Sequence, residues 1–280
     1  MRPTCRAALV QLCTPDTGTA ALDHAMPFVQ AAAAGGGELI LLPETCNLME
    51  RDQVALGRKV VGEADDPFIA GLRDFAAARH VWILLGSAVV RRPDGLRANR
   101  SLLIGPAGEI VARYDKIHLF DADLVNGQSY RESANYEAGT EAVVAETPWG
   151  GLGLTICYDI RFPVLHRDLA LAGAALIAVP AAFNRQTGAA HWEILLRARA
   201  IETGCFILAP AQGGNHADGE ATWGRSTIVA PWGEILAAEA GDQPGLVFAD
   251  LDLAAVAAAR AAIPALVNRR AYTPPRAIHR

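Results

Sequence analysis

The segment GLGLTICYDIRFP, residues 151–163, joins an apolar run to a helical pattern and decides how the chain folds. Leu152 to Cys157 predicts a buried strand, and Phe162 to Leu171 predicts the helix that follows it. Cys157 therefore lies at a strand-to-helix turn, where a nucleophile is exposed at a sheet edge and the next backbone N–H can face a developing oxyanion. The alternative is a small packed side chain, since free cysteine is often buried.

Outward from this segment, short apolar runs rich in β-branched residues alternate with helical patterns, and hairpins interrupt them. We expect strands at 6–12, 39–42, 81–90, 175–179, 206–209 and 246–251, helices around 22–33, 67–76, 162–171, 189–202 and 253–262, and hairpins joining 101–104 to 110–114 and 227–230 to 234–237. This pattern predicts a mixed sheet covered by helices. No repeat or linker divides the chain, so we expect one domain at 1–262 and a proline-containing C-terminal arm at 263–280.

Composition excludes several classes of protein. With 51% hydrophobic and 20% charged residues the chain is not intrinsically disordered, yet no apolar run approaches the roughly 20 residues of a membrane helix. The formal net charge of −5 disfavours a nucleic-acid partner. The five cysteines form no CxxC pair, and the N-terminus does not read as a signal peptide, so we expect a cytoplasmic protein with free thiols and no membrane partner.

Motifs for common cofactors are missing from the sequence. Gly151-Leu152-Gly153 begins like a dinucleotide fingerprint, but Ile156 stands at the third glycine position. There is no phosphate-binding GxxxxGK[ST], no GxSxG and no HExxH, and the seven histidines lack metal-ligand spacing. We therefore expect neither a metal nor an organic cofactor.

Two charged residues stand where a cysteine nucleophile would need them. Glu44 follows the apolar run 39–43, and Lys116 follows the first expected hairpin. A carboxylate and an ammonium beside one thiol supply a proton acceptor and an electrostatic stabiliser. From the residues alone, Glu44 can equally be a solvated strand end and Lys116 a surface charge.

Three segments resemble the signature blocks of the nitrilase superfamily of carbon–nitrogen hydrolases. They are LLPETCN at 41–47, RYDKIHLFD at 113–121 and GLGLTICYDIRFP at 151–163, and their order and spacing match. The resemblance continues through 181–206, APWGEIL at 230–236 and IPALVNRR at 263–270. It implies a four-layer αββα sandwich that forms dimers through the helix after the cysteine and through the C-terminal arm.

The resemblance also implies a catalytic set of Glu44, Lys116, Cys157 and Glu132. Glu44 would be the general base, and Lys116 with the Tyr158 backbone N–H would hold the oxyanion. Glu132 would anchor Lys116. The nearby ammonium is expected to lower the thiol pKa below its reference value of about 8.5.

Residues around this set are candidates for substrate binding, and some have structural alternatives. The candidates are Tyr158, Arg161, Phe183, Asn184, Thr187 and His191. We expect Asp159 and Arg161 to form an ion pair at the nucleophile turn, and His191 to hydrogen-bond a loop. Cys46 lies two residues from Glu44 and is expected to be packed, as are Cys5, Cys13 and Cys205.

The branch of the superfamily suggests the substrate. KIHLFD, RESANYEAG and the AHWE helix start resemble the Nit-type amidases, which include deaminated glutathione amidases and omega-amidases. We expect a thiol amidohydrolase that releases ammonia, with deaminated glutathione as the leading substrate. The alternatives are an omega-amidase acting on 2-oxoglutaramate or 2-oxosuccinamate, an N-carbamoyl amidohydrolase and a true nitrilase. The intact catalytic set disfavours a non-enzymatic interaction module.

Both leading substrates are anionic, so we expect a basic side chain in the pocket. Arg161, Arg185 and Arg225 are the candidates. Asp115 stands where Nit-type amidases usually carry a basic residue, which places an acid beside the expected site.

Overall fold

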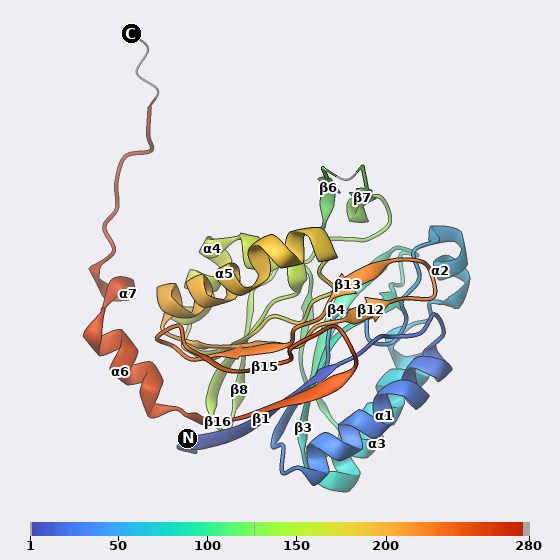
Figure 1. The fold of residues 1–280 in the computed structure, drawn as a ribbon, viewed down its shortest axis with the longest axis horizontal. Helices are drawn as coiled ribbons and strands as arrows, with labels where there is room; N and C mark the ends of the chain where they lie inside the picture. Colours follow the sequence, from blue (N-terminus) through green and yellow to red (C-terminus); the bar gives the residue numbers. More distant parts are fainter. Residues whose placement is uncertain (1, 126, 277–280) are drawn as a thin grey trace.

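The computed structural model describes residues 2–125 and 127–276, and it shows two six-stranded sheets packed face to face between layers of helices (Figure 1). The first sheet has the order β16-β1-β2-β3-β4-β5. Its strands are β1 (Thr4–Gln11), β2 (Leu39–Leu41), β3 (Trp82–Arg91), β4 (Arg97–Ile104), β5 (Ile110–Asp115) and β16 (Gly245–Asp252). Helices α1 (Gly18–Ala34) and α3 (Pro67–Arg79) cover its outer face (Figure 1).

The second sheet repeats this plan, with the order β15-β14-β11-β10-β9-β8. Its strands are β8 (Val143–Thr147), β9 (Gly150–Leu154), β10 (Ala174–Ala178), β11 (Phe206–Ala209), β14 (Thr227–Val229) and β15 (Ile235–Ala238). Helices α4 (Pro163–Leu171) and α5 (Arg185–Thr203) cover its outer face (Figure 1). The expected αββα sandwich is confirmed, as are both expected hairpins.

Three apolar layers hold the sandwich together. The middle cluster fills the space between the sheets and includes Trp149 and Phe206, while the outer two lie between each sheet and its helices. Strands that face apolar layers on both sides read as nearly continuous hydrophobic runs, and this explains why β2, β3 and β10 could be located from sequence. The inner layer also fixes the relative position of the two sheets, and hence of any site shared between them.

Smaller elements complete the chain. They are α2 (Gln53–Lys59), β6 (Asp121–Asp123), β7 (Ser129–Arg131), β12 (Gly213–Asn215), β13 (Ala221–Trp223), α6 (Ala254–Ala262), α7 (Ala265–Asn268) and the 3₁₀ helices Glu63–Asp65, Glu132–Ala134 and Cys157–Arg161. The expected arm leads away from the sandwich through α7 (Figure 1), and its last four residues lie outside the described part of the chain.

Local chemistry explains where two of the covering helices begin. Asp66 caps α3 by accepting hydrogen bonds from the N–H groups of Phe68 and Ile69, an interaction worth about 1 kcal/mol. Helix α5 begins at Arg185, four residues before the expected start, because Asn184 caps it through the Gln186 N–H. Within the described residues, no helix is long and apolar enough to cross a membrane.

Candidate active site

Glu44, Lys116 and Cys157 meet at one end of the sandwich because each follows the end of a strand. Glu44 comes after β2, Lys116 directly after β5 and Cys157 after β9, so both sheets contribute. Cys157 has a φ of 47° and Thr45, the neighbour of Glu44, a φ of 49°. These left-handed conformations are costly for residues other than glycine, and they mark sharp turns that aim the adjacent side chains into the site.

The Glu44 carboxylate is almost fully buried, at 4% exposure, and is completely hydrogen-bonded. Its Oε1 accepts hydrogen bonds from Lys116 Nζ at 2.8 Å and Asn99 Nδ2 at 2.9 Å, and its Oε2 accepts one from the Ala182 N–H at 2.8 Å. Because the donors come from both sheets, the orientation of this carboxylate depends on the packing between them.

Lys116 lies between two carboxylates. Its Nζ donates to Glu44 and to both oxygens of Glu132, at 2.9 and 3.2 Å, while the Phe120 N–H and Asn99 also bind Glu132. Burial alone would disfavour the ammonium, but the charges of Glu132 and Glu44 outweigh it, and the Lys116 pKa is held well above its ordinary value. Lys116 is therefore a fixed cation beside the thiol.

Cys157 differs from expectation in its protonation. Its thiol faces the cavity and shares a hydrogen bond with Glu44, with Lys116 close by. Desolvation by the surrounding protein and the negative charge of Glu44 together raise the Cys157 pKa well above its ordinary value, and the opposing effect of Lys116 is smaller. The expected lowering of this pKa is thus wrong, because burial and the charge of Glu44 together outweigh the effect of Lys116. The resting thiol is neutral and already paired with a base.

Asp159 binds the lysine segment to the nucleophile turn. This fully buried carboxylate accepts hydrogen bonds from Tyr114 Oη at 2.7 Å, the Ile156 N–H at 2.8 Å and the His118 N–H at 3.1 Å, and its Oδ1 lies 2.7 Å from His118 Nδ1. Arg161 makes no ion pair with it, so the expected Asp159–Arg161 pair is wrong. Asp159 instead joins the segments that carry Lys116 and Cys157.

Glu44, Lys116, Glu132 and Cys157 line the floor of a cavity of about 430 Å³. This volume suits a small organic ligand. Five of the six residues expected to bind substrate line the cavity, namely Tyr158, Arg161, Phe183, Asn184 and Thr187. The sixth, His191, is not among the described lining residues; its Nδ1 lies 3.3 Å from Nη1 of Arg161.

Two of the three candidate arginines are occupied elsewhere. Arg185 pairs with Asp242 at 2.5 Å, and Arg225 donates to the Ala240 carbonyl and lies over Trp223. Neither is among the described residues that line the cavity. Asp115 also points away from the cavity, because it forms a bidentate pair with Arg100 at 2.6 and 2.8 Å. Arg161 remains as the candidate of the three that reaches the cavity.

The sequence did not reveal several residues of the site. Asn99, which binds both buried carboxylates, lies inside β4 and carries no motif of its own. Arg51, Tyr130 and Glu220 also line the cavity and come from loops and a short strand. Their signal is weak because irregular segments lack the periodicity that identifies helices and strands.

The other cysteines lie outside the cavity. Cys5, Cys46 and Cys205 are buried, whereas Cys13, expected in the core, is partly exposed. Cys157 is the one cysteine among the described lining residues. Across residues 2–125 and 127–276, no cluster of three His, Cys, Asp or Glu side chains could hold a metal ion.

Lysine is rare in this chain. Of 25 basic residues, only Lys59 and Lys116 are lysines. Lys59 also lies between two carboxylates, Asp16 and Glu50, each at 2.8 Å, but its side chain is 27% exposed against 3% for Lys116. The two lysines thus have the same kind of ion pairing at different depths.

Comparison with known proteins agrees with this site. The model of the carbon–nitrogen hydrolase family matches residues 6–261. The chain is 42% identical over 246 residues to the deaminated glutathione amidase of Yersinia enterocolitica, covering 86% of this chain and 84% of that protein. It is 33% identical to human omega-amidase Nit2 over 267 residues, covering 95% of each.

A solved structure shows the same fold. The NitFhit protein of Caenorhabditis elegans superposes with a TM-score of 0.88 and 32% identity, covering 96% of this chain and 65% of that longer one. The matched region spans all three signature segments and both sheets of the sandwich. On sequence, fold and the arrangement at the shared end of its two sheets, the chain belongs to the carbon–nitrogen hydrolase family.

Proposed function

We propose that this hydrolase cleaves a linear amide through a thioester on Cys157, with Glu44, Lys116 and Glu132 as the other catalytic residues. The observation that carries the proposal is the buried ion network, in which Lys116 joins Glu44 to Glu132 beside the thiol. Buried charges this close are costly unless they serve each other or a reaction. Their position on the floor of a ligand-sized cavity favours a reaction.

Acylation begins with attack of the Cys157 sulfur on the amide carbon while Glu44 accepts the thiol proton. The resulting oxyanion is stabilised by Lys116 and the Tyr158 backbone N–H. An ammonium has three N–H donors, and Glu44 and Glu132 occupy two directions, so one can face the oxyanion. Collapse of the intermediate breaks the C–N bond, and Glu44 gives its proton to the departing nitrogen.

Deacylation uses the same groups in the reverse order. Glu44 takes a proton from water, and the oxygen attacks the thioester carbon. The second tetrahedral intermediate uses the same oxyanion donors. Its collapse breaks the C–S bond, returns the proton to sulfur and releases the carboxylic acid. One amide and one water give one acid and one amine, with no cofactor consumed.

The position of Arg161 in the cavity wall favours a substrate with a negative charge. It forms no ion pair with any described carboxylate, and its guanidinium lies over the rings of Phe183 at 5.4 Å and Tyr158 at 6.0 Å. An arginine in a cavity wall that has no carboxylate partner is suited to binding a carboxylate in bidentate fashion. We assign it the carboxylate of the 2-oxo acid portion of the substrate.

The leading substrate is deaminated glutathione, with an omega-amidase reaction on 2-oxoglutaramate as the alternative. The names of the relatives at 42% and 33% identity favour these two. The products differ, because deaminated glutathione has no primary amide. Cleavage of the amide that joins its 2-oxo acid portion to the peptide releases a peptide amine, so the ammonia expected from the sequence applies to the omega-amidase substrates.

The proposal is tested by Cys157→Ala, with Cys13→Ala as the control at another partly exposed cysteine. Cys157→Ala should abolish turnover of both substrates and acyl-adduct formation in intact-mass spectra, and Cys13→Ala should retain both. An adduct that persists in Cys157→Ala would refute the assigned nucleophile. Activity confined to N-carbamoyl amines or nitriles would refute the substrate class.

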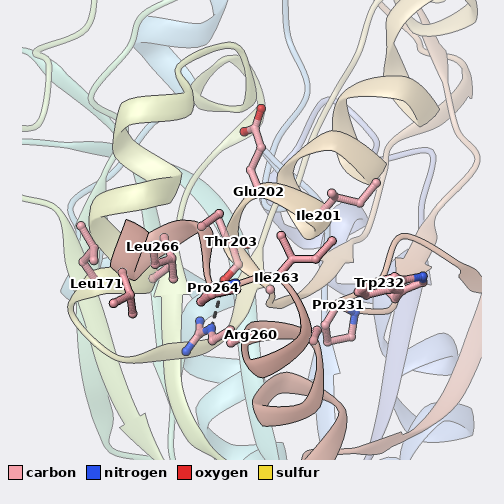
Figure 2. Close-up of a pocket in the computed structure, with 15 residues that line it drawn as sticks. Leu171, Ile201, Glu202, Thr203, Pro231, Trp232, Arg260, Ile263, Pro264 and Leu266 are labelled. Carbon is pink, nitrogen blue, oxygen red and sulfur yellow. Dashed lines mark hydrogen bonds between the residues drawn. The ribbon is translucent and has the colours of Figure 1, made fainter. Parts of the chain in front are cut away.

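We further propose that the protein is at least a dimer. Around α4, the end of α5 and the start of the arm, apolar side chains surround a cavity of about 470 Å³ (Figure 2). Several are exposed: Leu171 40%, Ile201 55%, Trp232 54% and Ile263 58%. An exposed apolar face of this kind is typical of a protein interface.

Sedimentation of the wild type and of Ile201→Glu tests the assembly. The wild type should sediment above the 29.6 kDa of a monomer at micromolar concentration, and Ile201→Glu should shift it toward the monomer. Val125→Glu, at a 97% exposed apolar residue distant in sequence, is the control and should behave as wild type. A monomeric wild type would refute the proposal.

We also propose a reducing compartment, the cytoplasm. All five cysteines are free, and such thiols persist where disulfide formation is disfavoured. Subcellular fractionation of the tagged protein tests this, and recovery in an oxidising compartment would refute it.

A further inference from the structure

A second arginine lines the cavity at a site that the proposed mechanism does not use. Arg51 lies on the loop between Glu44 and α2, Tyr130 on β7 and Glu220 just before β13, and all three line the cavity. Arg51 lies over the Tyr130 ring at 5.9 Å, and its Nη1 is 3.1 Å from Glu220 Oε2. Three segments far apart in the chain thus meet at one place in the cavity wall.

This cluster is anchored to the rigid part of the fold. Tyr130 Oη donates to Glu220 Oε1 at 2.6 Å and accepts from Asn184 Nδ2 at 3.1 Å, and Asn184 is the cap of helix α5. Burial and the Glu220 charge raise the pKa of Tyr130 to about 12, so its hydroxyl stays a neutral donor. The Glu220 carboxylate is therefore held in one orientation by groups other than Arg51.

The ion pair between Arg51 and Glu220 leaves hydrogen-bonding capacity unused. Glu220 Oε2 is buried and, despite its 3.1 Å approach to Arg51, accepts no hydrogen bond from any described residue. The Arg51 side chain is 49% exposed and makes no hydrogen bond to any residue in the ranges 2–125 and 127–276. The Arg51 guanidinium therefore has N–H donors that no described residue uses, and these donors can bind an acceptor on a ligand.

An aromatic row connects the two arginines of the cavity. Arg161 lies over Tyr158, the Tyr158 and Phe120 rings are 5.0 Å apart, and so are the Phe120 and Tyr130 rings, with Arg51 beyond Tyr130. All five residues line the same cavity. A guanidinium therefore stands at each end of an apolar wall, and this arrangement suits an elongated ligand with a carboxylate at each end.

We propose that Arg51 forms a second subsite that binds the terminal carboxylate of a peptide tail on the leaving-group side of the amide. The proposal rests on the proposed function and specifies its substrate class as 2-oxo acids with an amide at the far end of the acid, whose leaving group carries a second, distal carboxylate. Arg161 is assigned the carboxylate of the 2-oxo acid portion, so Arg51, at the other end of the aromatic row, is assigned to the leaving-group side. Glu220 is a positioning residue that holds Arg51.

A structural role for Arg51 would fasten the loop before α2 to β7 and would affect all substrates alike. The test therefore compares three substrates: deaminated glutathione, its C-terminal glycinamide, which lacks the distal charge, and 2-oxoglutaramate, which lacks the tail. The variants are Arg51→Met and a matched control, Arg6→Met. Arg6 also pairs with a carboxylate, Asp250 at 2.9 Å, and lies over an aromatic ring, Phe248 at 5.4 Å, but is outside the cavity.

The wild type should prefer deaminated glutathione to its glycinamide by at least about 10-fold in kcat/KM, as expected for loss of a charged hydrogen-bond partner. Arg51→Met should lower kcat/KM for deaminated glutathione by about 10- to 100-fold and leave the other two substrates within about twofold of the wild type. The preference for the free carboxylate should therefore disappear in the variant. Comparing the two enzymes on the two tailed substrates is a double-mutant cycle, and it measures the coupling between Arg51 and the distal carboxylate. Arg6→Met should behave as wild type.

Two outcomes in the Arg51→Met variant would overturn the inference while leaving the proposed function intact. One is an equal loss with all three substrates in Arg51→Met, and the other is an unchanged preference for the free carboxylate. Turnover of 2-oxoglutaramate by the wild type without turnover of either tailed substrate would also overturn it. If the wild type hydrolyses none of the three, the proposed function itself fails.

Discussion

Replacing Lys116 by methionine should separate the energetic role of the buried ion network from that of ordinary surface ion pairs. The substitution keeps the length of the side chain and removes its charge, leaving Glu44 and Glu132 without a cation. Lys59→Met is the matched control, because Lys59 also lies between two carboxylates at 2.8 Å but near the surface. The two variants differ mainly in the burial of the charges they leave unpaired.

The expected losses in free energy of unfolding differ several-fold. Breaking a buried ion pair costs about 3–5 kcal/mol, because the remaining charges are desolvated and unpaired. The exposed pairs of Lys59 should contribute about 0–1 kcal/mol. Urea unfolding at pH 7 of wild type, Lys116→Met and Lys59→Met measures both. In parallel, kcat of Lys116→Met should fall by about 10²–10³-fold, the usual effect of losing one oxyanion donor.

The pH dependence gives a second measurement with a definite sign. In the wild type the raised Lys116 pKa contributes stability that is present below about pH 10.4 and is lost as pH rises through the folded-state pKa. If Lys116→Met is no less stable at pH 7 than Lys59→Met, the reasoning about burial is refuted.

Three further predictions concern the base, the thiol and the contact between the sheets. Glu44→Gln should lower kcat by about 10²–10⁴-fold because the base is lost, and near-normal turnover would exclude that role. In the wild type, iodoacetamide should alkylate Cys157 increasingly fast between pH 7 and 9.5, because burial and the Glu44 charge raise the pKa of the thiol. Glu44→Gln should be alkylated faster than the wild type at pH 8. An alkylation rate that already reaches its plateau below pH 7 would contradict the raised pKa. Gly86→Ala should unfold at lower urea concentration, because a Cβ there would overlap the carbonyl oxygens of Leu42 and Pro43, which follow the neighbouring strand, and Pro180, which follows a strand of the other sheet. Gly241→Ala, with open space, should match the wild type. Equal midpoints would show that these three segments can move apart at little cost.

The sequence predicted the parts of the site that lie where regular structure ends. Buried strands carry a strong apolar signal, and Glu44 and Cys157 are the first chemically active residues after two of them. The start of α5 was misplaced because Gly188 disfavours a helix in sequence terms. In the fold that glycine is needed, since a Cβ there would overlap the Trp223 ring.

The partners of the predicted residues were less accessible to sequence reasoning. The hydrogen bond from Tyr114 to Asp159 spans 45 positions and joins β5 of the first sheet to the 3₁₀ helix Cys157–Arg161 that follows β9 of the second, and no local pattern encodes it. The same holds for Arg51 and Glu220, which are 169 positions apart and meet only because the sandwich brings their loops together. The thiol pKa was misjudged because its direction depends first on burial and then on the balance of two opposite charges, and both are properties of the folded structure.

The scarcity of lysine makes it possible to follow the opening of the candidate site by chemical labelling. Apart from the chain terminus, the protein presents two amines to an acylating reagent, and Lys116 is sealed between its carboxylates while Lys59 is partly accessible. A short pulse of an activated ester should therefore tag Lys59 in every molecule and Lys116 only in those whose cleft has opened. The ratio of the two tags in a peptide map then reports the fraction of molecules in which the site has opened, and Lys59 is the internal standard for Lys116.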